Sequence, residues 1–222
     1  MVNNLVIIGA SSELAISFNK IINSKKYNIY NISRNNKYSE IKLVDYISDT
    51  QKIYNFIKKI ENPTVLFFNG YLSENRPSKH PSSDEMIDTF NINFVTPFCL
   101  TQELSSNKNI AKFVYVSSIA AIKYRNKNYI YGSTKKLLEI SVPKIKEINY
   151  LFLRFGKIKT RMSKNHKDII YSLETETAAK LIIKNIDKDG IVYPKFGLKI
   201  ISFVIFLFPV KFLDFLEKQV SN

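Results

Sequence analysis

Tyr131 and Lys135 are the residues whose types and spacing most readily suggest chemistry. They lie four positions apart in a segment, 131–140, whose pattern predicts a helix, so both side chains should lie on one face. A tyrosine hydroxyl has a pKa of about 10, and a nearby ammonium group should stabilise the phenolate and lower that pKa. The pair is therefore a candidate general acid and base, although the same spacing also occurs by chance on helix surfaces.

Two upstream residues strengthen this candidate. Ser118 ends an apolar run thirteen residues before Tyr131, and Asn93 lies in the preceding helical segment. The four residues together indicate a site rather than a surface pair.

The elements that must position these residues can be read from hydrophobic patterning. Apolar runs recur along the chain, and stretches with helical periodicity separate them. Because the runs are apolar throughout, they predict strands buried on both faces, in an α/β fold with a doubly wound parallel sheet, the Rossmann fold. The expected strands are Leu5–Ile8, Tyr27–Ile32, Ile41–Val44, Val65–Phe68, Phe113–Val116, Leu151–Leu153 and Ile191–Tyr193.

Ligands of such a sheet bind beyond the carboxyl ends of the strands. The residues that follow the expected strands there are polar or small, and Gly9 follows the first of them. Gly9 should permit a tight turn into a helix whose free N–H groups and positive dipole end can hold a pyrophosphate.

Six short segments, in this order and spacing, resemble the short-chain dehydrogenase/reductase family. The resemblance covers about residues 5–162, and the expected strand near Ile191–Tyr193 also fits it. The matching segments are IIGASSELA at the first turn, FFNG, NFVTPF around Asn93, VYVSS ending at Ser118, YGSTK, and RFGKIKTRM.

This resemblance implies an oxidoreductase with four catalytic residues. Tyr131 would protonate a carbonyl oxygen as hydride arrives from a nicotinamide, or remove the hydroxyl proton in the reverse direction. Ser118 would hydrogen-bond the same oxygen. Lys135 would lower the pKa of Tyr131 and hold the nicotinamide ribose, and Asn93 would anchor a water in a proton relay to Lys135.

The resemblance also implies a set of contacts to the dinucleotide, each given with its part of the cofactor. The pyrophosphate would be bound by a turn that contains Gly9, Ser11, Ser12 and Leu14. The adenine would be contacted by Asp45, the ribose by Asn69, Gly70 and Lys135, and the carboxamide by Ile158 and Thr160.

Arg34 decides which dinucleotide is expected. It stands after the second strand, where an acidic residue would accept a hydrogen bond from a ribose 2′-hydroxyl. A guanidinium pairs with a 2′-phosphate, so the sequence favours NADP over NAD. The alternative is that Arg34 stacks on the adenine or faces solvent.

The sequence departs from the family pattern at two places. Glu13 and Ala15 replace glycines of the usual GxxxGxG turn, and we expect Glu13 to point to solvent, because a carboxylate directed inward would repel a pyrophosphate. Phe155 stands where a proline is usual. Pro143 should end or kink the catalytic helix near Val142, which puts the family's customary tetramer in doubt and leaves a homodimer or a monomer open.

Composition excludes several other classes of protein. The chain has 222 residues with 33 Lys and Arg against 19 Asp and Glu, a net charge of +14. No nucleic-acid-binding motif accompanies this charge, so we expect no nucleic-acid partner. One cysteine and two distant histidines predict neither a disulfide framework nor a metal site. Without a signal-peptide pattern, the chain is expected in the cytoplasm.

We divide the chain into residues 1–195, the NADP-binding catalytic domain, and residues 196–222, an apolar and basic extension. Residues 198–216 could lie in a membrane interface at the inner face of the membrane, or they could pack on the domain or on a second subunit. A span of eleven apolar residues is too short to cross a bilayer.

The substrate is expected to be a small carbonyl or alcohol compound. Two positively charged loops and the apolar C-terminal extension favour, as substrate, a sugar or lipid-linked sugar intermediate of cell-envelope polysaccharide synthesis. A ketoacyl or other lipid ketone and a catalytically idle NADP-sensing module are the alternatives. The loop residues are Arg76, His80, Arg161, Lys164, His166 and Lys167.

Overall fold

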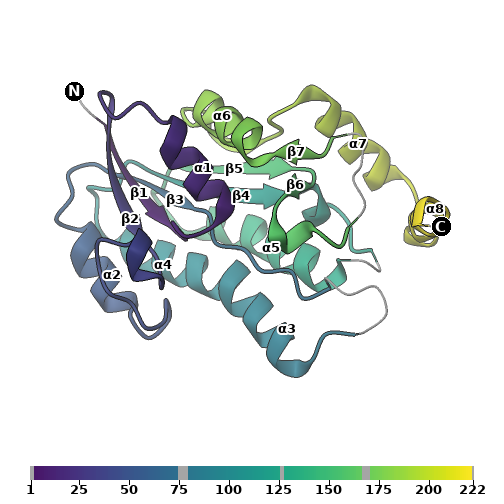
Figure 1. The fold of residues 1–222 in the computed structure, drawn as a ribbon, viewed down its shortest axis with the longest axis horizontal. Helices are drawn as coiled ribbons and strands as arrows, with labels where there is room; N and C mark the ends of the chain where they lie inside the picture. The colour runs from purple at the N-terminus through teal and green to yellow at the C-terminus, as the bar shows by residue number, and fades with distance from the viewer. Residues whose placement is uncertain (1–2, 75–79, 126–127, 167–170, 222) are drawn as a thin grey trace.

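A six-stranded parallel sheet forms the centre of the molecule (Figure 1). The computed structural model describes residues 3–74, 80–125, 128–166 and 171–221. The strand order is β2-β1-β3-β4-β5-β8, which confirms the predicted doubly wound sheet. Its strands are β1 (Asn3–Ile8), β2 (Tyr27–Ile32), β3 (Thr64–Phe67), β4 (Lys112–Ser118), β5 (Tyr150–Phe155) and β8 (Gly190–Val192). Two short strands, β6 (Ile158–Lys159) and β7 (Leu173–Glu174), pair with each other beside it.

Helices cover both faces of this sheet (Figure 1). Successive residues of a strand point to opposite faces, so Leu5 and Ile7 of β1 pack on one side, and Val6 and Ile8 pack on the other. The first face is covered by α1 (Glu13–Ile21) and α6 (Thr175–Asn185). The second is covered by α2 (Thr50–Ile57), α4 (Thr96–Ser105) and α5 (Tyr129–Ser141).

The expected strand at Ile41–Val44 is absent, which corrects one prediction. Leu43 is buried, but Val44 is 81% exposed. The Asp49 carboxylate accepts hydrogen bonds from the backbone N–H groups of Val44 (2.7 Å) and Asp45 (3.1 Å), so these groups do not form a strand ladder. The sheet therefore ends at β2 on this side.

The helix that precedes β4 contains an irregular turn. It begins as α3 (Ser83–Phe90), passes through a π-helical turn at Asn91–Val95, and continues as α4. A π-helical turn widens the helix and re-aims the side chains within it. Asn93 lies in this turn and is completely buried.

The C-terminal segment forms two helices at one end of the sheet, α7 (Phe196–Leu207) and α8 (Val210–Ser221) (Figure 1). Pro209 separates them. Leu198, Ile205 and Leu213 are buried and pack with Ile119 of the main domain. None of the helices in the described part of the chain is long and apolar enough to cross a bilayer.

Candidate active site

The carboxyl end of β4 and the first turns of α5 bring Ser118 and Tyr131 together. Ser118 is the last residue of β4, and a tight turn at Ile119–Ala121 follows it. The helix packs closely on this turn, since a Cβ at Gly132 would lie 2.6 Å from the carbonyl oxygen of Ala120. Gly132 is therefore required by close approach, a role that the sequence analysis did not assign to it.

The Ser118 side chain acts on the Tyr131 hydroxyl as a hydrogen-bonding group, which by itself lowers the pKa of the phenol. Burial of the Tyr131 hydroxyl raises its pKa to about 12, against the lowering effect of the Ser118 hydrogen bond and with a further raising effect of the Glu74 charge. The expected net lowering of the Tyr131 pKa is therefore wrong in direction, because desolvation by burial outweighs the groups that favour the phenolate. With the pKa raised, Tyr131 keeps its proton at neutral pH and can act as an acid.

Lys135 lies one helical turn after Tyr131, on the same face, as predicted. Its Nζ lies 5.8 Å from the centroid of the Tyr131 ring and donates a hydrogen bond to the carbonyl oxygen of Val116 (3.2 Å). Burial lowers the pKa of Lys135 to about 8, although the Glu139 carboxylate opposes this shift. The charge on Lys135 therefore depends on Glu139.

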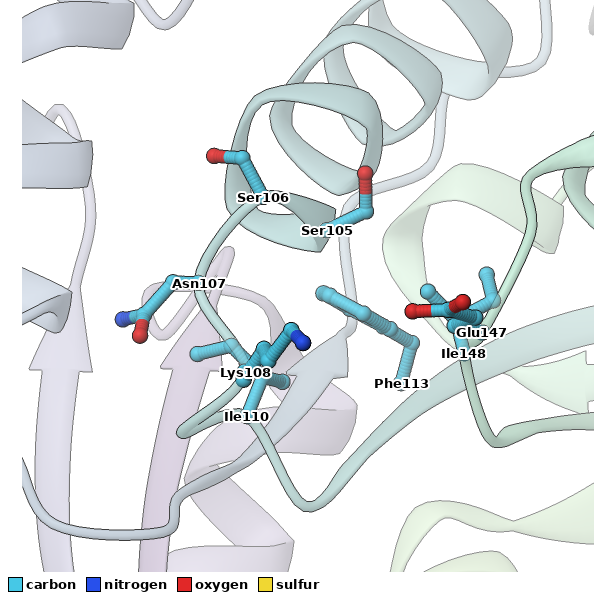
Figure 2. A pocket seen from close by; sticks show the side chains of 8 residues that line it. All are labelled: Ser105, Ser106, Asn107, Lys108, Ile110, Phe113, Glu147 and Ile148. Atoms are coloured by element: carbon cyan, nitrogen blue, oxygen red, sulfur yellow. The ribbon is translucent and has the colours of Figure 1, made fainter.

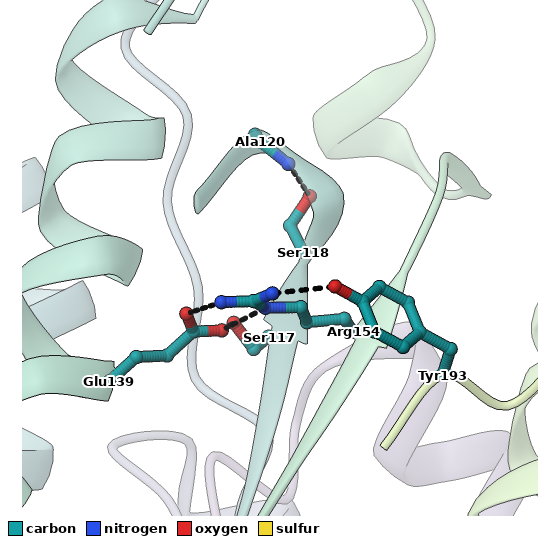
Figure 3. A network of polar contacts seen from close by, with 6 residues as sticks. All are labelled: Ser117, Ser118, Ala120, Glu139, Arg154 and Tyr193. Carbon is teal, nitrogen blue, oxygen red and sulfur yellow. Dashed lines mark hydrogen bonds and ion pairs between the residues drawn. The ribbon is translucent and has the colours of Figure 1, made fainter. Parts of the chain in front are cut away.

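Glu139 belongs to a buried polar network that the sequence analysis missed (Figure 3). Arg154 of β5 donates from Nε to Glu139 Oε1 (2.9 Å) and from Nη2 to Glu139 Oε2 (2.5 Å). Ser117 donates to the same carboxylate (2.7 Å), and Arg154 Nη1 donates to the Tyr193 hydroxyl (2.6 Å). The position of Glu139, four residues after Lys135, was the signal in the sequence that could have identified it.

The Asn93 side chain is hydrogen-bonded to two neighbouring segments. Its Oδ1 accepts from the backbone N–H of Tyr71 (2.8 Å), and its Nδ2 donates to the Tyr71 carbonyl (2.8 Å) and to Thr134 Oγ1 (3.2 Å). These bonds fasten the segment after β3 to α5. The side chain thus positions its neighbours, and the expected water relay to Lys135 stays a prediction.

The turn after β1 has the geometry of an anion site. Gly9 has φ +85°, and a Cβ there would lie 2.7 Å from the backbone N of Asn69, so only glycine fits. Ser12 caps α1 by accepting from the N–H of Ala15 (3.2 Å). Ser11 is half-buried and Leu14 is buried at the start of the helix, where unpaired backbone N–H groups can receive a pyrophosphate.

Asn69 carries an unpaired buried acceptor beside this turn. Its Nδ2 donates to the carbonyl of Ile92, whereas no described residue bonds to its Oδ1. The neighbouring Gly70 is exposed, and a Cβ there would meet only Asn93 Oδ1 and Met162 Sδ, both at 4.0 Å. A ribose hydroxyl is a group that would satisfy Oδ1, so the residues present fit a dinucleotide.

Glu13 is partly exposed, with 36% of its side-chain surface accessible, and it is also held by Arg161. Its Oε2 accepts from the backbone N–H of Arg161 (2.7 Å), and its Oε1 lies 3.2 Å from Arg161 Nε. Glu13 begins α1, whereas Arg161 follows β6. The ion pair thus links the pyrophosphate turn to the segment that contains Ile158 and Thr160.

Arg34 and Asp45 lie near one aromatic ring, that of Tyr46. The exposed guanidinium of Arg34 stands over the ring, 5.8 Å from its centroid. Asp45 Oδ1 accepts from the N–H groups of Ile47 (2.8 Å) and Ser48 (3.3 Å), which builds a local turn. Arg34 is therefore held at the end of β2 by stacking, with its N–H donors open to solvent.

The expected carboxamide contacts, Ile158 and Thr160, lie in and after β6. Both are half-buried, and the Thr160 N–H donates to Ser163 Oγ (3.2 Å). Of the loop cations, His80 is exposed, whereas Arg76 and Lys167 lie outside the described residues.

A hollow of about 380 Å³ lies away from these residues, at the amino ends of β4 and β5 (Figure 2). Its polar lining includes Ser105 and Ser106, whose hydroxyls donate to carbonyl groups of their own helix, those of Gln102 and Glu103. These hydroxyls are bonded to carbonyl groups at the C-terminal end of α4, so their donors are already used within the helix.

Solved structures with a similar fold are dehydrogenases and reductases. A short chain dehydrogenase from Burkholderia cenocepacia J2315, in complex with NADP, has a TM-score of 0.71 and 13% identity over 94% of this chain and 98% of that one. Aldohexose dehydrogenase from Thermoplasma acidophilum, in ligand-free form, has a TM-score of 0.69 and 14% identity, and the match covers 90% of this chain and 95% of that one. A dTDP-4-dehydrorhamnose reductase from Bacillus anthracis str. Ames, in complex with NADP, has a TM-score of 0.53 and 19% identity, and the match covers 72% of this chain and 55% of that one.

No protein-family model and no curated protein matches the chain. At identities below one fifth, the structural likeness shows a shared fold.

Proposed function

We propose that this chain, which has the fold of the short-chain dehydrogenases, is an NADP(H)-dependent oxidoreductase that interconverts a carbonyl group and a secondary alcohol. The observation that carries the proposal is the placement of Ser118 at the end of β4, beside Tyr131 in the first turn of α5, with the Lys135 ammonium 5.8 Å from the Tyr131 ring centroid. When bound, the dinucleotide supplies or accepts the hydride. The chain supplies the proton and the geometry.

Tyr131 and Ser118 act on the substrate oxygen. Both hydroxyls can donate to one carbonyl oxygen, which polarises the carbonyl and stabilises the negative charge that develops on it. Because Tyr131 is neutral at physiological pH, it then transfers its proton to that oxygen. The raised pKa of Tyr131 favours this acid role, so we propose carbonyl reduction as the working direction.

Lys135 holds the ribose hydroxyls of the nicotinamide half and a positive charge beside the phenol. Glu139 and Arg154 keep its ammonium in place, since Glu139 opposes the lowering of the pKa of Lys135 by burial. Asn93 fixes the segment after β3 against α5. The pyrophosphate would be held by the turn after β1, through Gly9, Ser11, Ser12 and Leu14. The adenine would be contacted by Asp45, the ribose by Asn69 and Gly70, and the carboxamide by Ile158 and Thr160.

Arg34 is proposed to select NADPH over NADH. Replacing Arg34 with alanine should weaken NADPH binding about 10- to 100-fold, the value of one or two charge-assisted hydrogen bonds, and leave NADH binding unchanged. Fluorescence titration with each nucleotide measures this difference.

Lys37→Ala is the matched control for this experiment. Lys37 is an exposed cation three positions from Arg34, but it stands over the ring of Tyr38 rather than that of Tyr46. The control variant should bind both nucleotides as the unmodified chain does. Equal affinity of the unmodified chain for NADPH and NADH would contradict the selection.

The substrate class that we propose is a sugar or lipid-linked sugar carbonyl of cell-envelope polysaccharide synthesis. Two of the similar structures carry sugar-related names, an aldohexose dehydrogenase and a dTDP-4-dehydrorhamnose reductase. The exposed cation of Lys164 follows the candidate carboxamide contact and could pair with a phosphate of such a substrate.

The outer face of α7 is proposed to contact the membrane surface. The inner face of the helix packs on the domain, whereas Phe196, Phe203 and Phe206 on the outer face are 77%, 62% and 64% exposed. Lys199 and Lys211 are exposed beside them. Contiguous apolar surface with adjacent cations suits the interface of an anionic membrane.

Vesicle flotation tests this contact. The intact chain should float with vesicles of phosphatidylglycerol and phosphatidylcholine, and the double variant Phe203→Ser, Phe206→Ser should lose at least about tenfold in bound fraction, because each phenylalanine contributes about 1.5–3 kcal/mol when buried. Truncation is unsuitable, since it would remove the buried Leu198.

Ile87→Ser is the control for flotation, because Ile87 is 56% exposed on α3. This variant should float like the intact chain. If the intact chain does not float, and the double variant instead dissociates a dimer in light scattering, the face is a subunit interface and the membrane proposal fails.

A further inference from the structure

The first turn of α5, which carries Tyr131, is capped by a residue from elsewhere in the chain. Its own N-cap residue, Asn128, makes no capping hydrogen bond through its side chain. The carboxylate of Glu74 instead accepts from the backbone N–H groups of Ile130 (2.5 Å) and Tyr131 (3.0 Å). The first N–H groups of a helix have no acceptor within the helix. In α5, two of them are bonded by the Glu74 carboxylate, which lies 56 and 57 residues earlier in the chain.

The position of the Glu74 carboxylate is fixed by its surroundings. Ser73 donates to Glu74 Oε2 (3.0 Å), and both residues are buried, at 4% and 8% exposure. Asn93 binds the N–H and the carbonyl of Tyr71, three residues earlier. The segment 71–74 is therefore fastened to the π-helical turn at one end and to α5 at the other.

We propose that Glu74 is a positioning residue for the catalytic tyrosine, because its carboxylate accepts from the N–H groups of Ile130 and Tyr131 and so fixes the first turn of α5. The inference rests on the proposed function, in which a neutral phenol donates a proton to the substrate. Glu74 would then act through Tyr131 without touching the substrate.

The charges around Tyr131 support this role. The positive end of the α5 dipole and the Lys135 ammonium, 5.8 Å from the ring centroid, both favour the phenolate, as does the Ser118 hydrogen bond from β4. Glu74 is the negative group that faces Tyr131 from the segment after β3, and its charge raises the pKa of the phenol. A negative cap at this helix start therefore offsets the groups that would otherwise ionise the tyrosine.

Glu74→Gln separates the charge from the cap. The glutamine amide oxygen can still accept from the N–H groups of Ile130 and Tyr131, but the charge is gone. In the ligand-free protein labelled with ¹³C-tyrosine, the Tyr131 resonance, assigned by its absence in Tyr131→Phe, should titrate about one pH unit lower than in the unmodified chain, since one nearby charge commonly shifts a pKa by this much. The melting temperature should change little.

Two further variants complete the test. Glu85→Gln removes a carboxylate that caps α3, where it accepts from the N–H of Ser82 (2.9 Å), and should leave the Tyr131 titration unchanged. Glu74→Asp retains the charge and should titrate like the unmodified chain. An unaltered Tyr131 titration in Glu74→Gln, or an equally lowered one in Glu74→Asp, would overturn the proposal. Because the titration uses neither nucleotide nor substrate, failure of the proposed oxidoreductase activity would not affect its outcome.

Discussion

Replacing Tyr131 with phenylalanine should slow carbonyl reduction by about 10²- to 10⁴-fold, the usual contribution of a positioned proton donor. The substitution removes the hydroxyl that Ser118 orients and leaves the ring, and so the packing of α5, in place. NADPH affinity should remain within about twofold, because Arg34 and the turn after β1 provide the proposed nucleotide contacts. Oxidation of NADPH with a panel of aldose, ketose and ketone substrates measures the rate.

Tyr129→Phe is the control for this prediction. Tyr129 lies two residues earlier on the same helix and is 37% exposed, so its hydroxyl is on a different face. The control variant should reduce the same substrates at the unmodified rate. If Tyr131→Phe binds NADPH tightly and neither it nor the unmodified chain reduces any carbonyl, the chain is a nucleotide-sensing module rather than an enzyme.

Replacing Arg154 with methionine should lower the free energy of unfolding by about 3–5 kcal/mol, since it leaves the Glu139 carboxylate buried without its cation. The side chains of Arg154 and Glu139 are only 11% and 1% exposed, so solvent screens the pair little. For a chain of this length, the loss corresponds to a decrease of about 6–20 °C in melting temperature. Differential scanning calorimetry measures it.

The double variant Arg154→Met, Glu139→Leu tests the physical reason. With both charges removed, no carboxylate remains unpaired, and the chain should recover most of the lost stability. A double variant that is as unstable as Arg154→Met would show that packing of the arginine, rather than the unpaired charge, causes the loss.

Local pattern was sufficient to predict most of the sheet. Runs such as Val65–Phe68 and Phe113–Val116 are apolar on both faces, and each became a buried central strand. Ile41–Val44 is also mostly apolar, but it contains Lys42 and would lie beyond β2, at the edge of the sheet. There the carboxylate of Asp49, from the start of the next helix, takes the backbone N–H groups of Val44 and Asp45. Composition of the run alone does not reveal this competition.

The site was predictable where its residues share a short motif. Tyr131 and Lys135 are one helical turn apart, and the helix alone brings them together. Glu74, Arg154 and Glu13 reach their partners over long sequence separations, so their roles depend on how β3, β5 and α1 pack in three dimensions. The direction of the Tyr131 pKa shift was predicted wrongly for a similar reason, because burial and the Glu74 charge come from distant segments.

The structure of this chain in complex with NADPH, determined by crystallography, tests the central claim most directly. We expect the nicotinamide ring to lie at the carboxyl edge of the sheet beside the hydroxyls of Tyr131 and Ser118, with the 2′-phosphate at Arg34. A nicotinamide ring bound away from Tyr131, or a chain that takes up no NADPH at all, would contradict it.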